Sequence, residues 1–191
     1  MRIYLTTDTH FYHSNMIKYC KRPIGFTEIV GLNLLDVGFK EDDVLIHLGD
    51  ICIGFDQKVH DLYIKPLKCK KWLVKGNHEH KSDNWYLNNG WDFVCKRFEN
   101  KYFGKNILFS HSPQEDNGFD FNIHGHFHNT LFRLLQGNWI VEDEKERNEK
   151  DLKVLTKKHK LLALEYTDYK PVLLEHFLEQ SNPTPKEEEA K

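Results

Sequence analysis

The chain has 191 residues and a formal net charge of −2 at pH 7. One compact domain is expected at this length, and the near-neutral charge argues against attachment to nucleic acid or a membrane through bulk charge. The chain opens MRIYLTTDTH, without a signal peptide or a long apolar stretch, so we expect a cytoplasmic protein.

The predicted elements alternate between strands and helices, which is typical of an α/β fold. A strand is predicted at 2–7, followed by helices at 14–22 and 26–39, with Thr27 as the candidate N-cap of the second helix. Further strands are predicted at 44–48, 71–75, 93–99, 101–103, 106–110 and 121–124, and short helices at 57–68 and 82–90.

The last third of the chain departs from this alternation. The run 142–160 is highly charged, and we interpret it as an exposed loop or surface helix inserted in a single domain that spans 1–179. Residues 161–166 and 171–177 are expected to close the fold as a hairpin. The tail 180–191 has the composition of a disordered segment.

Five of the predicted strands end at residues that can bind a metal or move a proton. These residues are Asp8 and His10 after the first strand, Asp50, Asn77 and His111 after three later strands, and His126 and His128 after the strand FNIH. Because sites gather outside the carboxyl ends of strands in α/β sheets, we expect the seven side chains to lie together. Glycines precede Asp50, Asn77 and His126, where they would allow sharp turns.

The set contains carboxylates, imidazoles and an amide but no thiolate, which suits Mn²⁺, Fe, Zn²⁺, Co²⁺ or Ni²⁺. Seven ligands are too many for one ion, so two divalent ions sharing a carboxylate are expected. Such a pair would retain positive charge suited to a phosphate and would activate a bridging hydroxide as nucleophile. His78 follows Asn77 and could protonate the leaving oxygen, while Glu79 could orient the site from outside the ligand set.

The motifs DTH, GD, GNHE, SH and GHFH, in this order between residues 3 and 128, resemble those of the calcineurin-like metallophosphoesterase family. The resemblance implies a four-layer αββα sandwich with two mixed β-sheets. It also implies a first metal, Mn²⁺ by preference, held by Asp8, His10 and His128, a second held by Asn77, His111 and His126, Asp50 as the bridge, and His78 against the phosphate.

Two departures from the family pattern bear on the substrate. Phosphoprotein phosphatases of this family follow GD with an aspartate and an arginine, whereas this chain has Ile53 and Gly54 there, which argues against that activity. The first motif continues as DTHFYHSN, with KRP downstream, and looks like a subset of bacterial and phage-type phosphoesterases. That likeness places His13, Asn15 and Arg22 on the substrate side, with Arg22 as a candidate phosphate contact.

These features favour a metal-dependent phosphodiesterase acting on small or nucleotide-like phosphodiesters, since the domain is small and shows neither a cap domain nor a long basic groove. A phosphomonoesterase or a nuclease is the alternative within the same class. From another class, the alternative is a non-catalytic scaffold that uses the same fold. His124 precedes the glycine of GHFH, and the ligand set is complete without it, so we expect a histidine that either supports the ligands from outside the set or is structural.

Overall fold

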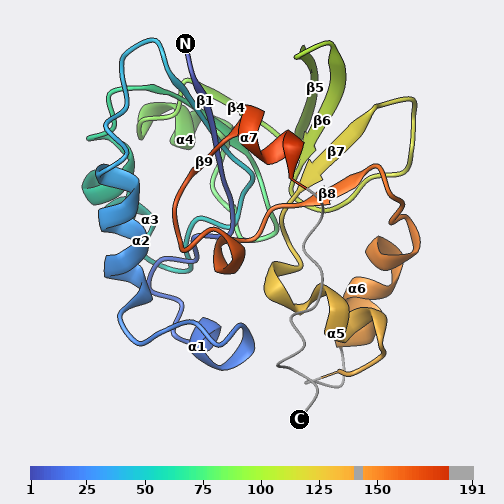
Figure 1. The fold of residues 1–191 in the computed structure, drawn as a ribbon. Coiled ribbons are helices and arrows are strands. Elements are labelled where there is room, and N and C mark those ends of the chain that lie inside the picture. Colours follow the sequence, from blue (N-terminus) through green and yellow to red (C-terminus); the bar gives the residue numbers. More distant parts are fainter. Residues whose placement is uncertain (140–143, 181–191) are drawn as a thin grey trace.

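The computed structural model describes residues 1–139 and 144–180, and its strands form two mixed sheets that pack face to face (Figure 1). The first sheet has the order β4-β3-β2-β1-β9, with strands β1 Ile3–Thr6, β2 Val44–His47, β3 Lys70–Val74, β4 Phe93–Cys95 and β9 Val172–Leu173. Strands β1 to β4 are parallel and β9 is antiparallel to β1. The second sheet has the order β5-β6-β7-β8, with strands β5 Arg97–Tyr102, β6 Lys105–Ser110, β7 Phe121–His124 and β8 His159–Leu161. Only β5 is antiparallel to its neighbour.

Side chains of the first sheet alternate between two hydrophobic cores. Leu5 of β1 and its partner Ile46 of β2 face the second sheet, where they meet Phe109 and Ile123. Tyr4 and Leu45, which precede them in sequence, face the opposite side of the sheet and join a second core. Because both faces are buried, β1 and β2 read as continuous apolar runs instead of alternating ones.

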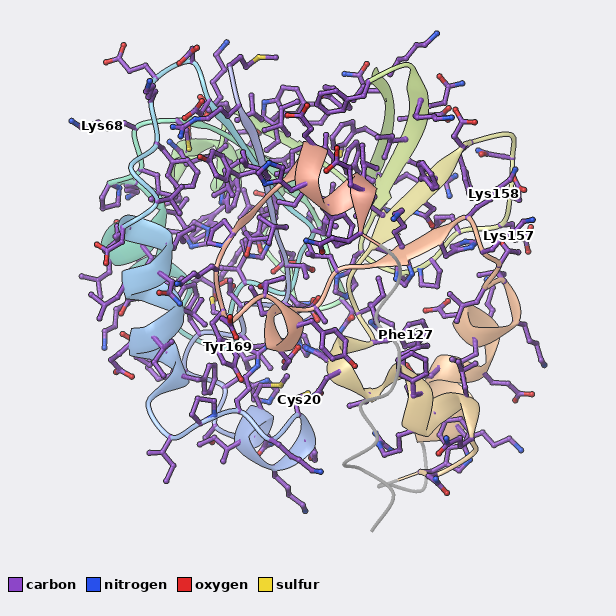
Figure 2. The ribbon with its side chains drawn as sticks, in the orientation of Figure 1. Cys20, Lys68, Phe127, Lys157, Lys158 and Tyr169 are labelled. Carbon is purple, nitrogen blue, oxygen red and sulfur yellow. The ribbon has the colours of Figure 1, made fainter. Side chains whose placement is uncertain are left out.

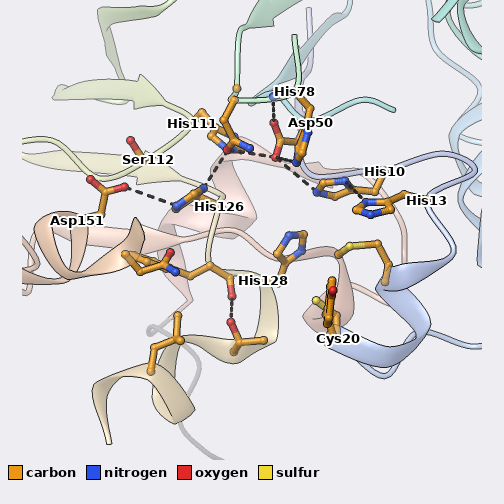
Figure 3. Close-up of a pocket in the computed structure, with 18 of the residues that line it drawn as sticks. His10, His13, Cys20, Asp50, His78, His111, Ser112, His126, His128 and Asp151 are labelled. Carbon is orange, nitrogen blue, oxygen red and sulfur yellow. Dashed lines mark hydrogen bonds and ion pairs between the residues drawn. The ribbon is translucent and has the colours of Figure 1, made fainter. Parts of the chain in front are cut away.

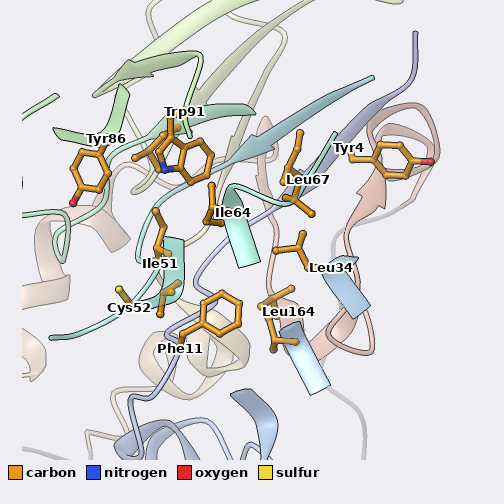
Figure 4. Close-up of a cluster of buried hydrophobic side chains, with 14 of the residues drawn as sticks. Tyr4, Phe11, Leu34, Ile51, Cys52, Ile64, Leu67, Tyr86, Trp91 and Leu164 are labelled. Carbon is orange, nitrogen blue, oxygen red and sulfur yellow. The ribbon is translucent and has the colours of Figure 1, made fainter. Parts of the chain in front are cut away.

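Helices cover the outer face of the first sheet. They are α1 Asn15–Tyr19, α2 Phe26–Leu35, α3 Asp56–Val59 with the π-helical turn His60–Ile64, and α4 Asp83–Asn88. Figure 4 shows Phe11, Leu34, Ile64 and Leu164 gathered in the core that these helices make with the sheet. Helix α2 begins at Phe26 with Gly25 at its N-cap, so the expected cap at Thr27 is wrong. The Thr27 hydroxyl instead accepts a hydrogen bond from the backbone amide of Tyr12 at 2.9 Å.

The fourth layer is small and lies at the carboxyl end of the second sheet. It consists of the 3-10 turn His128–Thr130 with α5 Leu131–Leu135, and of α6 Glu144–Lys153. These helices pack on Leu161 of β8 and on Phe127, which is 1% exposed. In Figure 2 Phe127 lies inside the molecule, whereas Lys68, Lys157 and Lys158 point outwards at its rim. The expected αββα order of layers is therefore confirmed.

The carboxyl-terminal hairpin predicted at 161–166 and 171–177 is wrong. Strand β8 pairs with β7 in the second sheet, and β9 pairs with β1 in the first. Between them lies the 3-10 turn Leu164–Tyr166, and the run after β9 forms helix α7 Leu174–Glu179. An alternation of apolar residues predicts a strand but does not identify its partner.

Helix α6 falls within the charged run expected to be exposed surface. Leu152 of this helix and Leu155 after it pack into the core around Phe127, so the run is docked on the domain. The predicted tail 180–191 lies outside the described residues apart from Gln180. Within the described part of the chain, every helix is too short or too polar to cross a membrane.

Candidate metal centre

The loops after β1 and β2 continue the pairing of their strands past the end of the sheet. The backbone amide of Asp8 donates to Gly49 O at 2.8 Å, and the amide of His10 donates to Asp50 O at 3.0 Å. Phe11 and Cys52 form a parallel bridge beyond them. This extension holds Asp8 and His10 beside Asp50.

Contacts between the two sheets bring the second set of candidate residues to the same place. His111 follows β6, and its Nδ1 lies 2.8 Å from Leu48 O at the end of β2. His126 follows β7, and its backbone amide donates to Asp8 Oδ2 at 3.0 Å. Five strand ends from two sheets therefore converge on one cluster, of which Figure 3 shows His10, Asp50, His111, His126 and His128.

Asp50 lies at the centre of this cluster. Its Oδ2 is 3.5 Å from His10 Nε2 and 3.4 Å from His111 Nε2. On one side, Asp8 Oδ1 is 3.9 Å from His10 Nε2 and 3.6 Å from His128 Nε2. On the other side, His111 Nε2 is 3.0 Å from Asn77 Oδ1 and 3.2 Å from His126 Nδ1. All seven predicted ligands are thus brought together, in two groups that meet at Asp50.

Two buried atoms in this cluster fit a bound cation. Asp8 Oδ1 and His10 Nε2 have no hydrogen-bond partner among the described residues, although both are buried. Asp8, His10 and His128 also offer ligand atoms within 4.8 Å of one another, as do Asp8, Asp50 and His111. Buried polar atoms are normally satisfied, so these atoms indicate where a metal ion would bind.

The backbone at these positions is itself unusual. Five of the seven residues have a positive φ: Asp8 (47°), His10 (45°), Asp50 (58°), His126 (71°) and His128 (51°). Left-handed backbone is uncommon for residues with a side chain, and it persists where the surroundings impose it. The surrounding structure therefore holds these residues in a strained backbone conformation that directs their side chains into the cluster.

The glycines before Asn77 and His126 are needed for close approach. A Cβ on Gly76 would lie 2.3 Å from Asp50 Oδ1, and a Cβ on Gly125 would lie 2.2 Å from Asp8 Oδ2. A Cβ on Gly49 would also come too close to the backbone, at 2.4 Å from Gly76 N, and Gly49 has in addition a φ of 94°. The turn predicted from glycine thus holds for Gly49, whereas the other two make room for the carboxylates.

Glu79 anchors two of the loops from beneath. Its Oε2 accepts hydrogen bonds from the backbone amides of Asp50 at 2.7 Å and Gly76 at 2.6 Å, and its Oε1 accepts one from Ile51 at 2.9 Å. The side chain is buried, and burial raises its pKa. Glu79 orients the site from outside the cluster, as the sequence predicts.

Arg22 does not face the substrate side. The side chain is fully buried; Nη1 donates to Thr9 O at 3.0 Å, Nη2 donates to Asp8 O at 2.7 Å, and Nε donates to Glu165 Oε1 at 2.8 Å. With these donors occupied, Arg22 holds the loop after β1 in place, and the expected phosphate contact is corrected to a structural role.

Glu165 is a site residue that the sequence analysis missed. It lies in the 3-10 turn after β8, and its Oε1 is 3.4 Å from His128 Nδ1, the ring nitrogen that faces away from Asp8. Burial opposes its charge, but His128 and Arg22 lower the pKa of Glu165 to about 2. The run LLALEY contains this glutamate, but no motif distinguishes it from a surface residue.

The four histidines of the cluster differ in the direction of their pKa shifts, since the pKa values of His10 and His126 are lowered and those of His111 and His128 are raised. Burial lowers the pKa of His126 to about 3 and holds that of His10 well below its usual range. Burial also opposes charge on His111, but neighbouring Asp50 raises the pKa of His111 to about 10. Burial opposes charge on Asp50 too, yet His111 and His10 hold its pKa far below the ordinary value. Metal ligation requires the unprotonated imidazole, which His10 and His126 already favour.

A cavity of about 740 Å³ opens on the cluster. His78 lines it with 30% of its side chain exposed, and His78 Nε2 lies 3.7 Å from Asp50 Oδ2. His13 also lines the cavity, with its Nδ1 3.2 Å from His10 Nδ1. Asn15 is exposed at the start of α1 and is not among the residues that line the cavity. Of the three expected substrate-side residues, the structure therefore brings only His13 to the cavity.

His124 lies away from the cluster. Ile123 points into the core between the sheets, so His124 points to the opposite face of β7. There its ring lies 5.9 Å from that of Phe127 and 6.0 Å from that of His159.

Comparison with known proteins agrees with this geometry. A model of the calcineurin-like phosphoesterase family matches residues 1–184. The uncharacterized protein MJ1445 of Methanocaldococcus jannaschii is 29% identical over 135 residues, which cover 66% of this chain and 69% of that protein. The crystal structure of AQ665 from Aquifex aeolicus, a protein of unknown function, is similar with a TM-score of 0.63 and 28% identity. That match covers 92% of this chain and 96% of the other.

Proposed function

The chain belongs to the calcineurin-like phosphoesterase family, and we propose that it is a hydrolase that uses two divalent metal ions to cleave small or nucleotide-like phosphodiesters. The observation that carries this proposal is the convergence of all seven candidate ligands on Asp50. Four histidines, two aspartates and an asparagine form a mixed nitrogen and oxygen set that suits Mn²⁺, our preferred metal, and also Fe, Zn²⁺, Co²⁺ or Ni²⁺.

The two groups of side chains suggest how the ions would be shared. Asp8, His10 and His128 would hold the first ion, and Asn77, His111 and His126 would hold the second, with Asp50 common to both. The unpartnered atoms of Asp8 and His10 support the first site. The short distances from His111 to Asn77 and His126 support the second. When bound, the two ions supply Lewis acidity and an activated water near neutral pH.

His78 is the proposed proton donor to the leaving oxygen. Its ring borders the cavity and is partly exposed, so it can reach a substrate that the cluster holds. Asp50 Oδ1 accepts a hydrogen bond from the His78 backbone amide at 3.0 Å, which fixes the donor relative to the cluster. A positioned acid of this kind contributes roughly 10²–10⁴-fold to a proton-transfer step.

The cavity supports a small organic substrate. Its volume of about 740 Å³ lies in the range common for small-molecule sites. Met16, Tyr19 and Leu134 line it with apolar surface, while Lys96 lines it with positive charge. That combination suits a phosphate that carries a nucleoside-sized group. Ile53 also lines the cavity, at the place of the aspartate that precedes the arginine in phosphoprotein phosphatases.

The test compares a phosphodiester with its matched monoester. With Mn²⁺, we expect bis(p-nitrophenyl) phosphate to be hydrolysed faster than p-nitrophenyl phosphate, and a chelator to abolish both reactions. Equal or reversed rates would favour the alternative of a phosphomonoesterase, and cleavage of an oligonucleotide in preference to either would favour a nuclease. Absence of turnover with every divalent metal would instead support a non-catalytic scaffold. A cytoplasmic location remains part of the proposal.

A further inference from the structure

Each histidine of the cluster has one ring nitrogen inside it and the other directed at a partner outside. For His111 the outer partner is Leu48 O, at 2.8 Å from Nδ1. For His10 it is His13, at 3.2 Å between the Nδ1 atoms, and for His128 it is Glu165. Outer partners of this kind fix the tautomer and orientation of a metal-binding imidazole.

His126 completes the pattern with a partner from the charged run. Its Nδ1 faces His111 in the cluster, and its Nε2 lies 3.6 Å from Asp151 Oδ2 on helix α6 (Figure 3). The side chains are 21% and 24% exposed, so solvent screens the contact only partly. Asp151 approaches the nitrogen that points away from the cluster, so it lies outside the proposed ligand set.

Helix α6 is held in this position by apolar contacts. Leu152, next to Asp151, packs with Leu155 into the core around Phe127, the residue that follows His126. Asn148, one turn before Leu152, lines the cavity together with Asp151. Asn148, Asp151 and Leu152 are spaced three and four residues apart, so they share one face of the helix, and this face meets both the core around Phe127 and the cavity.

We propose that Asp151 is a positioning residue, whose carboxylate, 3.6 Å from His126 Nε2, keeps a proton on that nitrogen and holds His126 Nδ1 toward the second metal ion. This inference rests on the proposed two-metal site and extends it to α6, the element expected to be solvated surface. A carboxylate that accepts from Nε2–H keeps the proton on that nitrogen and leaves the Nδ1 lone pair free for the ion.

Binding of Mn²⁺ to the purified full-length chain, measured without substrate, tests the proposal. Titration calorimetry gives the affinity of each ion, and electron paramagnetic resonance detects the coupled Mn²⁺ pair. The variant is Asp151→Ala, and Asp151→Glu is the conservative rescue. The matched control is Glu149→Ala, on the same helix. The Glu149 carboxylate is 47% exposed, and within the described residues its ion pair is with Lys153.

We expect Asp151→Ala to lower the affinity for the second Mn²⁺ ion by roughly 10–100-fold, while the first ion binds as in the wild type. Asp151→Glu should recover most of that loss, and Glu149→Ala should bind both ions normally. The proposal is overturned if Asp151→Ala binds both ions like the wild type, if its affinity for both ions falls equally, or if Glu149→Ala has the same effect as Asp151→Ala. An unfolding midpoint measured without metal checks that each variant is folded.

The same experiment separates this inference from the proposed activity. A wild-type chain that binds two Mn²⁺ ions but hydrolyses no phosphoester would contradict the hydrolase and leave the role of Asp151 standing. A wild-type chain that binds fewer than two Mn²⁺ ions would overturn the role of Asp151 directly, because no second ion would exist for His126 to hold.

Discussion

One carboxylate oxygen of Glu79 accepts the backbone amide hydrogen of Asp50 at 2.7 Å, and this contact fixes the residue on which the cluster of candidate metal ligands is centred. The same oxygen accepts from Gly76, and the other oxygen accepts from Ile51. The loops after β2 and β3 therefore share one buried anchor, which requires acceptors at both of its oxygen positions.

Glu79→Gln should destabilise the fold and weaken metal binding. A glutamine places an NH₂ group at one oxygen position, where it would face a backbone N–H instead of accepting from it. Leaving a buried donor unpaired costs about 1–3 kcal/mol, and Asp50 would lose its fixed position. Chemical denaturation and Mn²⁺ titration measure the two effects. Glu99→Gln, on the exposed edge strand β5, is the control that should change neither. Wild-type stability and Mn²⁺ affinity in Glu79→Gln would contradict the anchoring role.

Gly125→Ala should impair the metal centre through contact alone. The added Cβ would meet Asp8 Oδ2 at 2.2 Å and Thr7 Oγ1 at the same distance, so the loop or the carboxylate must move. Gly38→Ala is a useful comparison, because Gly38 has a φ of 65° and open space around its Cβ position. That variant should lose about 1–2 kcal/mol from backbone strain and keep its Mn²⁺ affinity. A Gly125→Ala chain that binds Mn²⁺ as tightly as the wild type would show that the close approach is not needed.

The candidate ligands were predictable from the sequence because each directly follows a short apolar strand. The carboxyl ends of parallel strands lie at a common edge of a sheet. The positions of DTH, GD, GNHE, SH and GHFH at strand ends therefore predict that their side chains lie close together. That reasoning covers strand ends within one sheet, whereas the meeting of β1, β2 and β3 with β6 and β7 also depends on how the two sheets pack. The assignment of β8 and β9 to different sheets was missed, and there the prediction of a hairpin was wrong.

The outer partners were not predictable in the same way. Glu165 and Asp151 reach His128 and His126 through tertiary packing, Glu165 from a 3-10 turn after β8 and Asp151 from helix α6. In the sequence they are two of many acidic residues in charged or mixed surroundings. Arg22 shows the converse, since a basic residue near the first motif suggested a phosphate contact while the fold buries it among carbonyl groups.

Arg22→Lys should lower stability without a selective effect on substrate affinity. A lysine keeps the charge, but its single ammonium group cannot donate to Thr9 O, Asp8 O and Glu165 as the planar guanidinium does. Buried acceptors then lose their donors, which costs about 1–3 kcal/mol of stability. Thermal unfolding should show the loss. Arg97→Lys changes an arginine on the exposed strand β5 and should leave the unfolding midpoint within experimental scatter. A raised KM with unchanged stability in Arg22→Lys would instead restore the expected phosphate contact.

The role of His78 can be read from the leaving group. If His78 protonates the leaving oxygen, its removal should matter little for a p-nitrophenolate, which leaves without a proton, and greatly for an alkoxide, which needs one. His78→Ala should therefore reduce kcat for a diester with an alkyl or nucleoside leaving group by roughly 10²–10⁴-fold, and reduce it far less for an aryl diester.

His80→Ala is the matched control, because His80 lies two residues further on, is exposed, and is not among the residues that line the cavity. Mn²⁺ titration of His78→Ala should show both ions bound, since the ring lies beside the proposed ligands without belonging to them. An equal loss of kcat for aryl and alkyl leaving groups would assign His78 to phosphate binding and remove its role as the acid.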